Sequence, residues 1–87
     1  MKILLSSKYI KSYRKLVTNN PPLHIKTKKQ LKILLQNPKH PSLRLHKLSG
    51  EKIEQWSISV AKNIRIIFEY TDDGIYLTNI GTHNQVY

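Results

Sequence analysis

The first half of the chain carries apolar residues with a helical period. A short apolar run within residues 1–5 has the character of a strand. Over residues 7–17 the apolar side chains fall on one arc of a helical wheel, and most of the Lys and Arg side chains fall on the other. Ser6 or Ser7 offers a side-chain oxygen that can cap a helix at this point. The pattern predicts a strand followed by an amphipathic helix.

A second helical pattern runs over residues 23–36. Its apolar side chains also share one arc. Pro21 and Pro22 suit the first turn, because the N–H that proline lacks is not needed there. Pro38 ends the helix. Ile33 falls on the polar side, so we expect it to be a lone exposed apolar residue or part of a groove for a partner.

In the second half of the chain the period changes to two. Residues 56–60 alternate apolar and small polar side chains, and residues 64–70 nearly do the same. Both segments are therefore predicted to be strands. We expect them to form a hairpin with a three-residue loop at 61–63, which sets Val60 opposite Ile64.

This register sorts the side chains of the two strands onto two faces. Ser57, Ser59 and Arg65 share one face. A two-residue loop would instead turn Arg65 toward the core, and such a slip is costly where one face is buried. The other face is predicted to be buried and carries Trp56, Ile58, Val60, Ile64, Ile66, Phe68 and Tyr70.

Further strands complete the predicted sheet. Asp73 and Gly74 are residue types that two-residue hairpins need, and they lead to a last strand that ends near Ile80. Another strand is expected at residues 43–48. The fold class is therefore α+β: an N-terminal strand and a two-helix pair packed on one face of an antiparallel sheet. We expect one domain over residues 1–87.

The charge of the chain predicts which kind of partner it binds. The 87 residues include 15 Lys and Arg against 5 Asp and Glu, a net charge of +10, and all five acids fall between positions 51 and 73. Such an excess favours polyanions, so nucleic acid is the leading partner and an acidic protein is the next. There is no cysteine, and no apolar stretch approaches a signal sequence or a membrane span. We therefore expect a cytoplasmic protein with no membrane partner.

Four residues can carry the chemistry of RNA cleavage without a metal. In the predicted register Arg65 lies opposite Thr82, so we expect His83, the next residue, to lie beside Arg65. An imidazole can move protons near neutral pH, and a guanidinium can stabilise charge on a phosphate. His46 and Tyr87 add a second imidazole and a terminal phenol. The four histidines show no metal-ligand spacing and the glycines are isolated, so we expect no metal and no cofactor.

Three segments resemble the RelE/ParE toxin superfamily, and its YafQ- and YoeB-like mRNA interferases in particular. These segments are residues 40–50 (HPSLRLHKLSG), 64–68 (IRIIF) and 80–87 (IGTHNQVY). The resemblance implies a twisted antiparallel sheet, an antitoxin from the same operon, and cleavage of mRNA in the ribosomal A site. It assigns catalytic roles to His46, Arg65, His83 and Tyr87.

The sequence also departs from these relatives. Ser59 and Asn63 stand where YafQ-like members carry a catalytic histidine and an aspartate, and Ser42 stands where YoeB-like members carry a glutamate. RelE itself has lysines at the positions of Ser57 and Ser59. One acid/base partner is therefore missing or moved, and our hypothesis is that His46 and His83 share both proton transfers.

The resemblance and the charge together predict a toxin that acts as a ribosome-dependent mRNA endoribonuclease and is held by an acidic antitoxin. Two alternatives remain: a ParE-like inhibitor of DNA gyrase, which needs the fold but not these histidines, and a catalytically silent member that only binds the antitoxin. The closing Gly-Thr-His-x-x-x-Tyr favours the nuclease. The residues predicted to bind RNA are Lys8, Lys11, Lys15, Arg44, Lys47 and Lys62.

Overall fold

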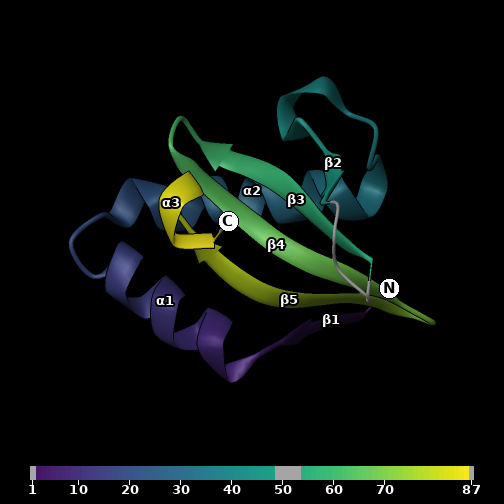
Figure 1. Cartoon of the computed structure of the whole chain (residues 1–87). Helices are drawn as coiled ribbons and strands as arrows, with labels where there is room; N and C mark the ends of the chain where they lie inside the picture. Colours follow the sequence, from purple (N-terminus) through teal and green to yellow (C-terminus); the bar gives the residue numbers. More distant parts are fainter. Residues whose placement is uncertain (1, 49–53, 87) are drawn as a thin grey trace.

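The computed structural model describes residues 2–48 and 54–86 and has a sheet with helices on both faces (Figure 1). The predicted N-terminal strand and helix pair are confirmed. The predicted strand at 43–48 begins only at His46, because a short 3-10 helix precedes it, and the C-terminal helix was not predicted. The elements in chain order are β1 (Lys2–Leu5), α1 (Ser7–Val17), α2 (Pro21–Gln36), the 3-10 helix η1 (Pro41–Leu43), β2 (His46–Leu48), β3 (Gln55–Ala61), β4 (Ile64–Thr71), β5 (Gly74–Gly81) and α3 (His83–Val86).

The five strands lie in the order β1-β5-β4-β3-β2. The expectation of an antiparallel sheet is correct for β2 to β5, but β1 runs parallel to β5. Parallel neighbours need a long crossover connection. Here the chain crosses through α1, α2 and the first three antiparallel strands before β5 lies beside β1. The sheet is therefore mixed.

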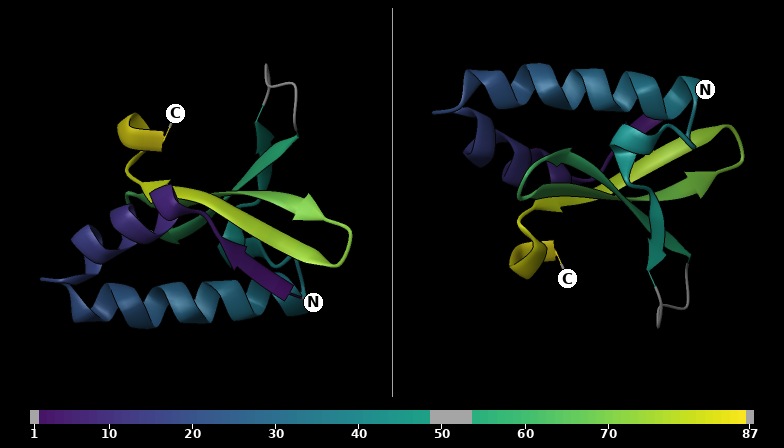
Figure 2. Two further views of the ribbon diagram at one scale, coloured as in Figure 1. Left: turned by 90° about the horizontal axis from the view of Figure 1, so that it is seen from below. Right: turned by 90° about the horizontal axis from the view of Figure 1, so that it is seen from above.

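The helices divide between the two faces of the sheet. Helices α1 and α2 pack on one face, as predicted, and α3 lies on the other at the end of β5 (Figure 2). Ser6 caps α1 by accepting a hydrogen bond from the Tyr9 N–H, and Asn20 caps α2 in the same way. The Ser6 hydroxyl also donates to the carbonyl of Thr78, which ties the start of α1 to β5. None of the helices in the described ranges is long and apolar enough to cross a membrane.

The core lies between the sheet and the helix pair. Burial raises the pKa of the Tyr9 hydroxyl, with a smaller contribution from neighbouring Tyr13. Two expectations were wrong: Tyr70 is 44% exposed at the far end of β4, and Ile33 packs against the core. The buried apolar residues of this core are Tyr9, Leu23, Leu34, Leu43, Ile58, Val60, Ile66, Phe68, Ile75, Leu77 and Ile80.

The β3–β4 hairpin has the predicted register but not the predicted loop. Ile58 pairs with Ile66 and Ser59 with Arg65, as expected. The turn, however, contains two residues, 62 and 63, because Ala61 pairs with Ile64. A bulge between Ser59 and Ala61 takes up the extra residue, Val60. A two-residue turn without a bulge would direct Arg65 toward the core. The bulge reverses this effect and keeps Arg65 on the sheet face away from the helices.

The β4–β5 hairpin differs from the prediction by one residue. Its turn lies at residues 72 and 73, so Thr71 pairs with Gly74. A second irregularity follows between Ile67 and Phe68. Arg65 therefore lies opposite Gly81 and not opposite Thr82. The turn begins one residue earlier than predicted, which alone would set Arg65 opposite Ile80, and the bulge shifts the register back by one residue to Gly81.

Gly74 is required by the close approach of β1. A Cβ atom at this position would lie 1.8 Å from the carbonyl oxygen of Lys2, a backbone atom that cannot move without breaking the β1–β5 pairing. We expect Gly74→Ala to lower the free energy of unfolding by about 3 kcal/mol. Urea denaturation measures this change. Asp72→Ala, at an exposed position in the same turn, is the control and should change stability by no more than about 0.5 kcal/mol. Equal stability of the two variants would contradict the close approach.

Candidate active site

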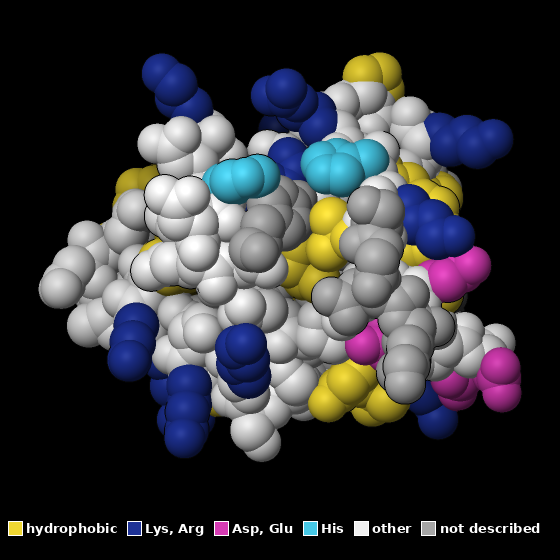
Figure 3. Space-filling model, viewed as in Figure 1, with side chains coloured by type: hydrophobic (Ala, Val, Ile, Leu, Met, Phe, Trp, Pro, Cys, Tyr) yellow, Lys and Arg dark blue, Asp and Glu magenta, His cyan; other side chains and the backbone are white. Residues whose placement is uncertain are grey.

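A cleft opens on the sheet face that α1 and α2 leave uncovered, where β3 and β4 turn and β5 ends. Its volume is about 470 Å³. Figure 3 shows His side chains and Lys and Arg side chains on this face. The lining residues come from four segments and are Arg44, Ser59, Lys62, Asn63, Arg65, Thr82, His83 and Asn84. The cleft therefore combines residues of β3 and β4 with two turns and the start of α3.

The Arg65 guanidinium is held by a buried hydroxyl on the neighbouring strand. Ser57 is fully buried, and its Oγ accepts one hydrogen bond from Arg65 Nε at 3.0 Å and another from an Arg65 terminal nitrogen at 2.9 Å. These two bonds fix the plane of the guanidinium, which determines the direction in which its remaining donors point. The hairpin register makes this possible because Ser57 and Arg65 lie two residues apart across the β3–β4 pair on the same face.

A third bond to Arg65 comes from the turn before β2. Arg44 is the one non-glycine residue of the described ranges with a positive φ, at 48°. This left-handed conformation is uncommon for a residue with a long side chain and costs about 1 kcal/mol or more. It ends η1, and the Arg44 carbonyl accepts a hydrogen bond of 2.9 Å from Arg65. The side chain of Arg44 lines the cleft beside that of Arg65.

His46 completes the cluster from β2. Its Nε2 lies 3.3 Å from the Ser57 hydroxyl, and its Nδ1 lies 3.2 Å from both the Arg44 carbonyl and Arg65. His46 therefore links three groups of the cluster: the Ser57 hydroxyl, the Arg44 carbonyl and the Arg65 guanidinium.

His83 reaches the cleft through the short helix α3. The backbone N–H of Thr82 donates to the Gln85 side-chain oxygen at 2.8 Å, and the Thr82 carbonyl accepts from the N–H groups of Gln85 and Val86. These bonds close the chain into a turn immediately after β5. Gly81 permits the turn, since a Cβ there would lie 2.7 Å from the Gln85 oxygen. His83 stands at the exposed start of α3 and lines the cleft together with Arg65.

The cleft has the electrostatic character of an anion site. Arg44, Lys62 and Arg65 line it, whereas its lining within the described residues includes no Asp or Glu. A guanidinium whose plane is fixed can bind two phosphate oxygens, and an exposed imidazole beside it can exchange a proton with a bound ligand. The described residues contain no group of three or more His, Cys, Asp or Glu that could hold a metal ion.

The structure brings some predicted site residues together and separates others. The cleft is lined by Arg65, His83, Arg44 and Lys62, and His46 contacts Arg65. Of the positions where the sequence departs from its relatives, Ser59 and Asn63 line the cleft as well.

Other predicted residues lie away from the cleft or outside the described residues. Lys47 forms an ion pair with Glu54 at 2.9 Å on the exposed edge of the sheet. Lys8 and Lys15 line a different pocket, and Lys11 is exposed on α1. Tyr87 lies outside the residues that the structure describes.

Ser57 belongs to the candidate site by its contacts with Arg65, and sequence analysis did not identify it as a site residue. The alternating sequence pattern correctly placed Ser57 on the same sheet face as Arg65. That shared face was the only indication in the sequence that the two side chains could interact. What the pattern could not reveal is that the hydroxyl is buried beneath the guanidinium, since burial on that face depends on the position of His46 and of the Arg44 turn.

Comparison with known proteins identifies the family of the chain. The family model described as YafQ, a bacterial toxin of type II toxin–antitoxin systems, matches residues 1–87. No curated protein matches the sequence.

Several solved structures share the fold. They include a copper-bound mutant toxin from Helicobacter pylori (20% identity, covering 100% of this chain and 99% of that one, TM-score 0.83), the E. coli DinJ-YafQ toxin–antitoxin complex (23%, 99% and 96%, 0.81) and the YoeB dimer from Staphylococcus aureus (18%, 95% and 97%, 0.81). At sequence identities this low, the structural similarity shows a common fold. The family is shown by the family model, which matches every residue of the chain. The chain belongs to the YafQ family of bacterial toxins of type II toxin–antitoxin systems.

Proposed function

We propose that this toxin is a ribosome-dependent mRNA endoribonuclease that works without a metal ion. The observation that carries the proposal is that Arg65 and His83 line one cleft, with the guanidinium fixed by the buried Ser57 hydroxyl. A cleft with this charge suits a phosphodiester, and an imidazole beside it suits proton transfer. An inhibitor of DNA gyrase would not need an arginine and a histidine in one cleft.

In the proposed reaction the ribose 2′-oxygen attacks the adjacent phosphorus. The P–O bond to the 5′-oxygen breaks, which leaves a 2′,3′-cyclic phosphate on one product and a 5′-hydroxyl on the other. One group takes the 2′-hydroxyl proton, and another returns a proton to the 5′-oxygen. His83 lines the cleft, and His46 lies 3.2 Å from the Arg65 guanidinium, so we assign the two transfers to this pair. Tyr87 keeps its predicted role of stacking on a base or moving a proton.

Arg65 has the electrostatic role in this scheme. Negative charge on the phosphate oxygens grows as the 2′-oxygen attacks, and preorganised donors are most effective when they need not move at that moment. Two of the guanidinium nitrogens are already committed to Ser57 and Arg44. The remaining N–H groups are those available to the phosphate.

The partners we propose are mRNA, the ribosomal A site and an acidic antitoxin. The relative YafQ has been crystallised in complex with DinJ as a toxin–antitoxin pair. A net charge of +10 suits both an acidic protein and RNA. Arg44 and Lys62 at the cleft, together with Lys8, Lys11, Lys15 and Lys47, are the residues we propose to bind RNA.

Mapping mRNA cuts in a translating extract, with and without ribosomes, tests the function. We expect cuts only when ribosomes are present, and we expect Arg65→Ala to reduce cutting about 100- to 1,000-fold because a preorganised charge is lost. Arg14→Ala removes the same charge from an exposed position on α1 and should leave cutting unchanged. Intact mRNA together with loss of DNA supercoiling would contradict the proposal, as would full cutting by both His46→Gln and His83→Gln.

The Ser57 hydroxyl should act through Arg65. Ser57→Ala removes a buried hydrogen bond to a charged group, worth about 1.5–3 kcal/mol, so single-turnover cutting should fall roughly 10- to 100-fold. Thr71→Ala removes a hydroxyl from an exposed site on β4 and is the matched control. In an Arg65→Ala background the Ser57 substitution should have little further effect. Additive losses in the double variant would show that Ser57 acts by some other route.

RNA binding should depend steeply on salt. For a single strand the logarithm of the binding constant falls with the logarithm of salt concentration by about 0.7 for each phosphate contact. Several Lys and Arg contacts therefore predict a slope of about −2 to −4. Fluorescence anisotropy with a labelled 2′-O-methyl RNA measures it without cleavage. An affinity that barely changes between low and high salt would exclude the basic residues as the RNA surface.

A further inference from the structure

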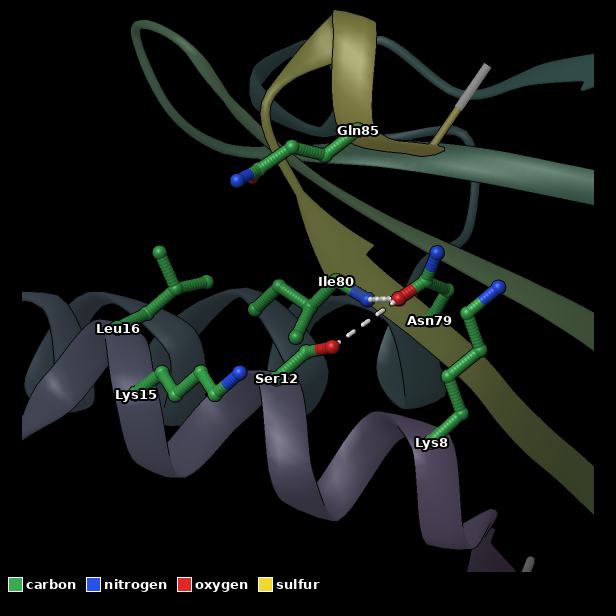
Figure 4. A pocket seen from close by; sticks show the side chains of 7 residues that line it. All are labelled: Lys8, Ser12, Lys15, Leu16, Asn79, Ile80 and Gln85. Carbon is green, nitrogen blue, oxygen red and sulfur yellow. Dashed lines mark hydrogen bonds between the residues drawn. The ribbon is translucent and has the colours of Figure 1, made fainter.

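A second pocket lies at the edge of the sheet, between α1, β5 and α3 (Figure 4). Strand β1 pairs with β5 only as far as Leu77, and the pocket opens beyond that point. Its volume is about 200 Å³. The polar side chains that line it are Lys8, Ser12, Lys15, Asn79 and Gln85.

Asn79 directs its amide nitrogen into this pocket. The side chain is about nine-tenths buried, and its Oδ1 accepts a hydrogen bond of 2.9 Å from the backbone N–H of Ile80. The Ser12 hydroxyl makes a longer contact of 3.5 Å with the same oxygen. A backbone N–H can only donate, so the oxygen and nitrogen of the amide are assigned without ambiguity. The hydrogen bonds of this side chain to other described residues involve only its oxygen, and its amide nitrogen faces the pocket (Figure 4).

Gln85 repeats this arrangement from the opposite side. Its Oε1 accepts from the Thr82 N–H at 2.8 Å, which fixes the amide in the same way. The amide nitrogen extends over the pocket from α3 (Figure 4). A backbone N–H bonded to each oxygen fixes the orientation of both amides, and the amide nitrogens are left as donors at the pocket.

The helix α1 supplies positive charge below these donors. Lys8, Ser12 and Lys15 are spaced four and three residues apart, so they share one face of the helix. The lining of the pocket, taken over the described residues, contains no Asp or Glu. Exposed lysines alone are ordinary solvated side chains. Lysines together with two amides whose nitrogens lie at the pocket form a receptor for an anion with several oxygens.

We propose that this pocket binds a second phosphate of the RNA strand whose scissile phosphate occupies the cleft. The short helix α3 separates the two sites, since Thr82, His83 and Asn84 line the cleft and Gln85 lines the pocket. A strand that leaves the cleft past α3 would bring a neighbouring phosphate to Asn79. The inference rests on the proposed function in taking RNA as the ligand, and it assigns Asn79 and Gln85 as binding residues.

NMR of the full chain tests the pocket directly, because side-chain amides give their own ¹H–¹⁵N signals. The probe is a short 2′-O-methyl RNA, which cannot be cleaved. We expect the side-chain signals of Asn79 and Gln85 to shift during the titration, and to saturate at the same RNA concentration as the signals of the cleft. Unmoved amide signals, in a titration that shifts the Arg65 Nε–H signal, would overturn the inference and leave the nuclease proposal intact.

Matched substitutions separate the pocket from general charge. Gln85→Glu keeps an oxygen for the Thr82 N–H but replaces the donor group by a negative oxygen, and Gln36→Glu makes the same change at the exposed end of α2. We expect Gln85→Glu to weaken RNA binding about tenfold, the equivalent of one charge-assisted hydrogen bond, and Gln36→Glu to have little effect. Equal weakening by both would overturn the inference.

A second matched pair does not rely on α3. Lys8→Met with Lys15→Met removes two charges at the pocket, and Lys26→Met with Lys29→Met removes two from exposed positions of α2. Only the first pair should abolish the RNA-dependent shift of the Asn79 amide. Persistence of that shift in the first pair would overturn the inference. Shifts at Asn79 and Gln85 in a protein that cuts no mRNA on ribosomes would support the pocket while refuting the nuclease.

Discussion

The hydroxyl of Ser57 accepts two hydrogen bonds from Arg65, and the geometry of the candidate site depends on this interaction. An arginine on an open sheet face would ordinarily sample many rotamers and lose entropy on binding a ligand. Here a buried oxygen and the Arg44 carbonyl hold the guanidinium in one plane. His46 is tied to the same two groups. Three segments that are separate in sequence are therefore joined through one side chain.

The sheet is the frame that makes this interaction possible. Ser57 and Arg65 share a face only because the bulge at Val60 compensates for a turn that is one residue shorter than the pattern predicts. At the end of β5 the chain turns immediately into α3, which sets His83 at the cleft and Gln85 at the second pocket. The same short helix thus connects the two sites that we propose for successive phosphates. Loss of the bulge at Val60 would place Ser57 and Arg65 on opposite faces of the sheet.

The periodic parts of the fold could be predicted from the sequence, and the irregular parts could not. Both long helices and the central register of β3 and β4 follow from hydrophobic spacing, which records one buried face. The parallel pairing of β1, the bulges and the left-handed Arg44 depend on contacts between distant segments, and local pattern contains no signal for them. The proximity of Arg65 and His83 was predicted correctly, but from a register that was wrong by one residue. The error was harmless because α3, which was not predicted, brings His83 back to the cleft.

A structure of the protein with an uncleavable 2′-O-methyl RNA tests the central claim most directly. We expect one phosphate in the cleft within hydrogen-bond distance of the Arg65 guanidinium, about 3 Å, and the His83 ring beside the adjoining ribose. The bonds from Arg65 to Ser57 should be unchanged from the free protein, as preorganisation requires. RNA bound elsewhere on the surface, or an Arg65 side chain that has left Ser57 to reach the phosphate, would contradict the account.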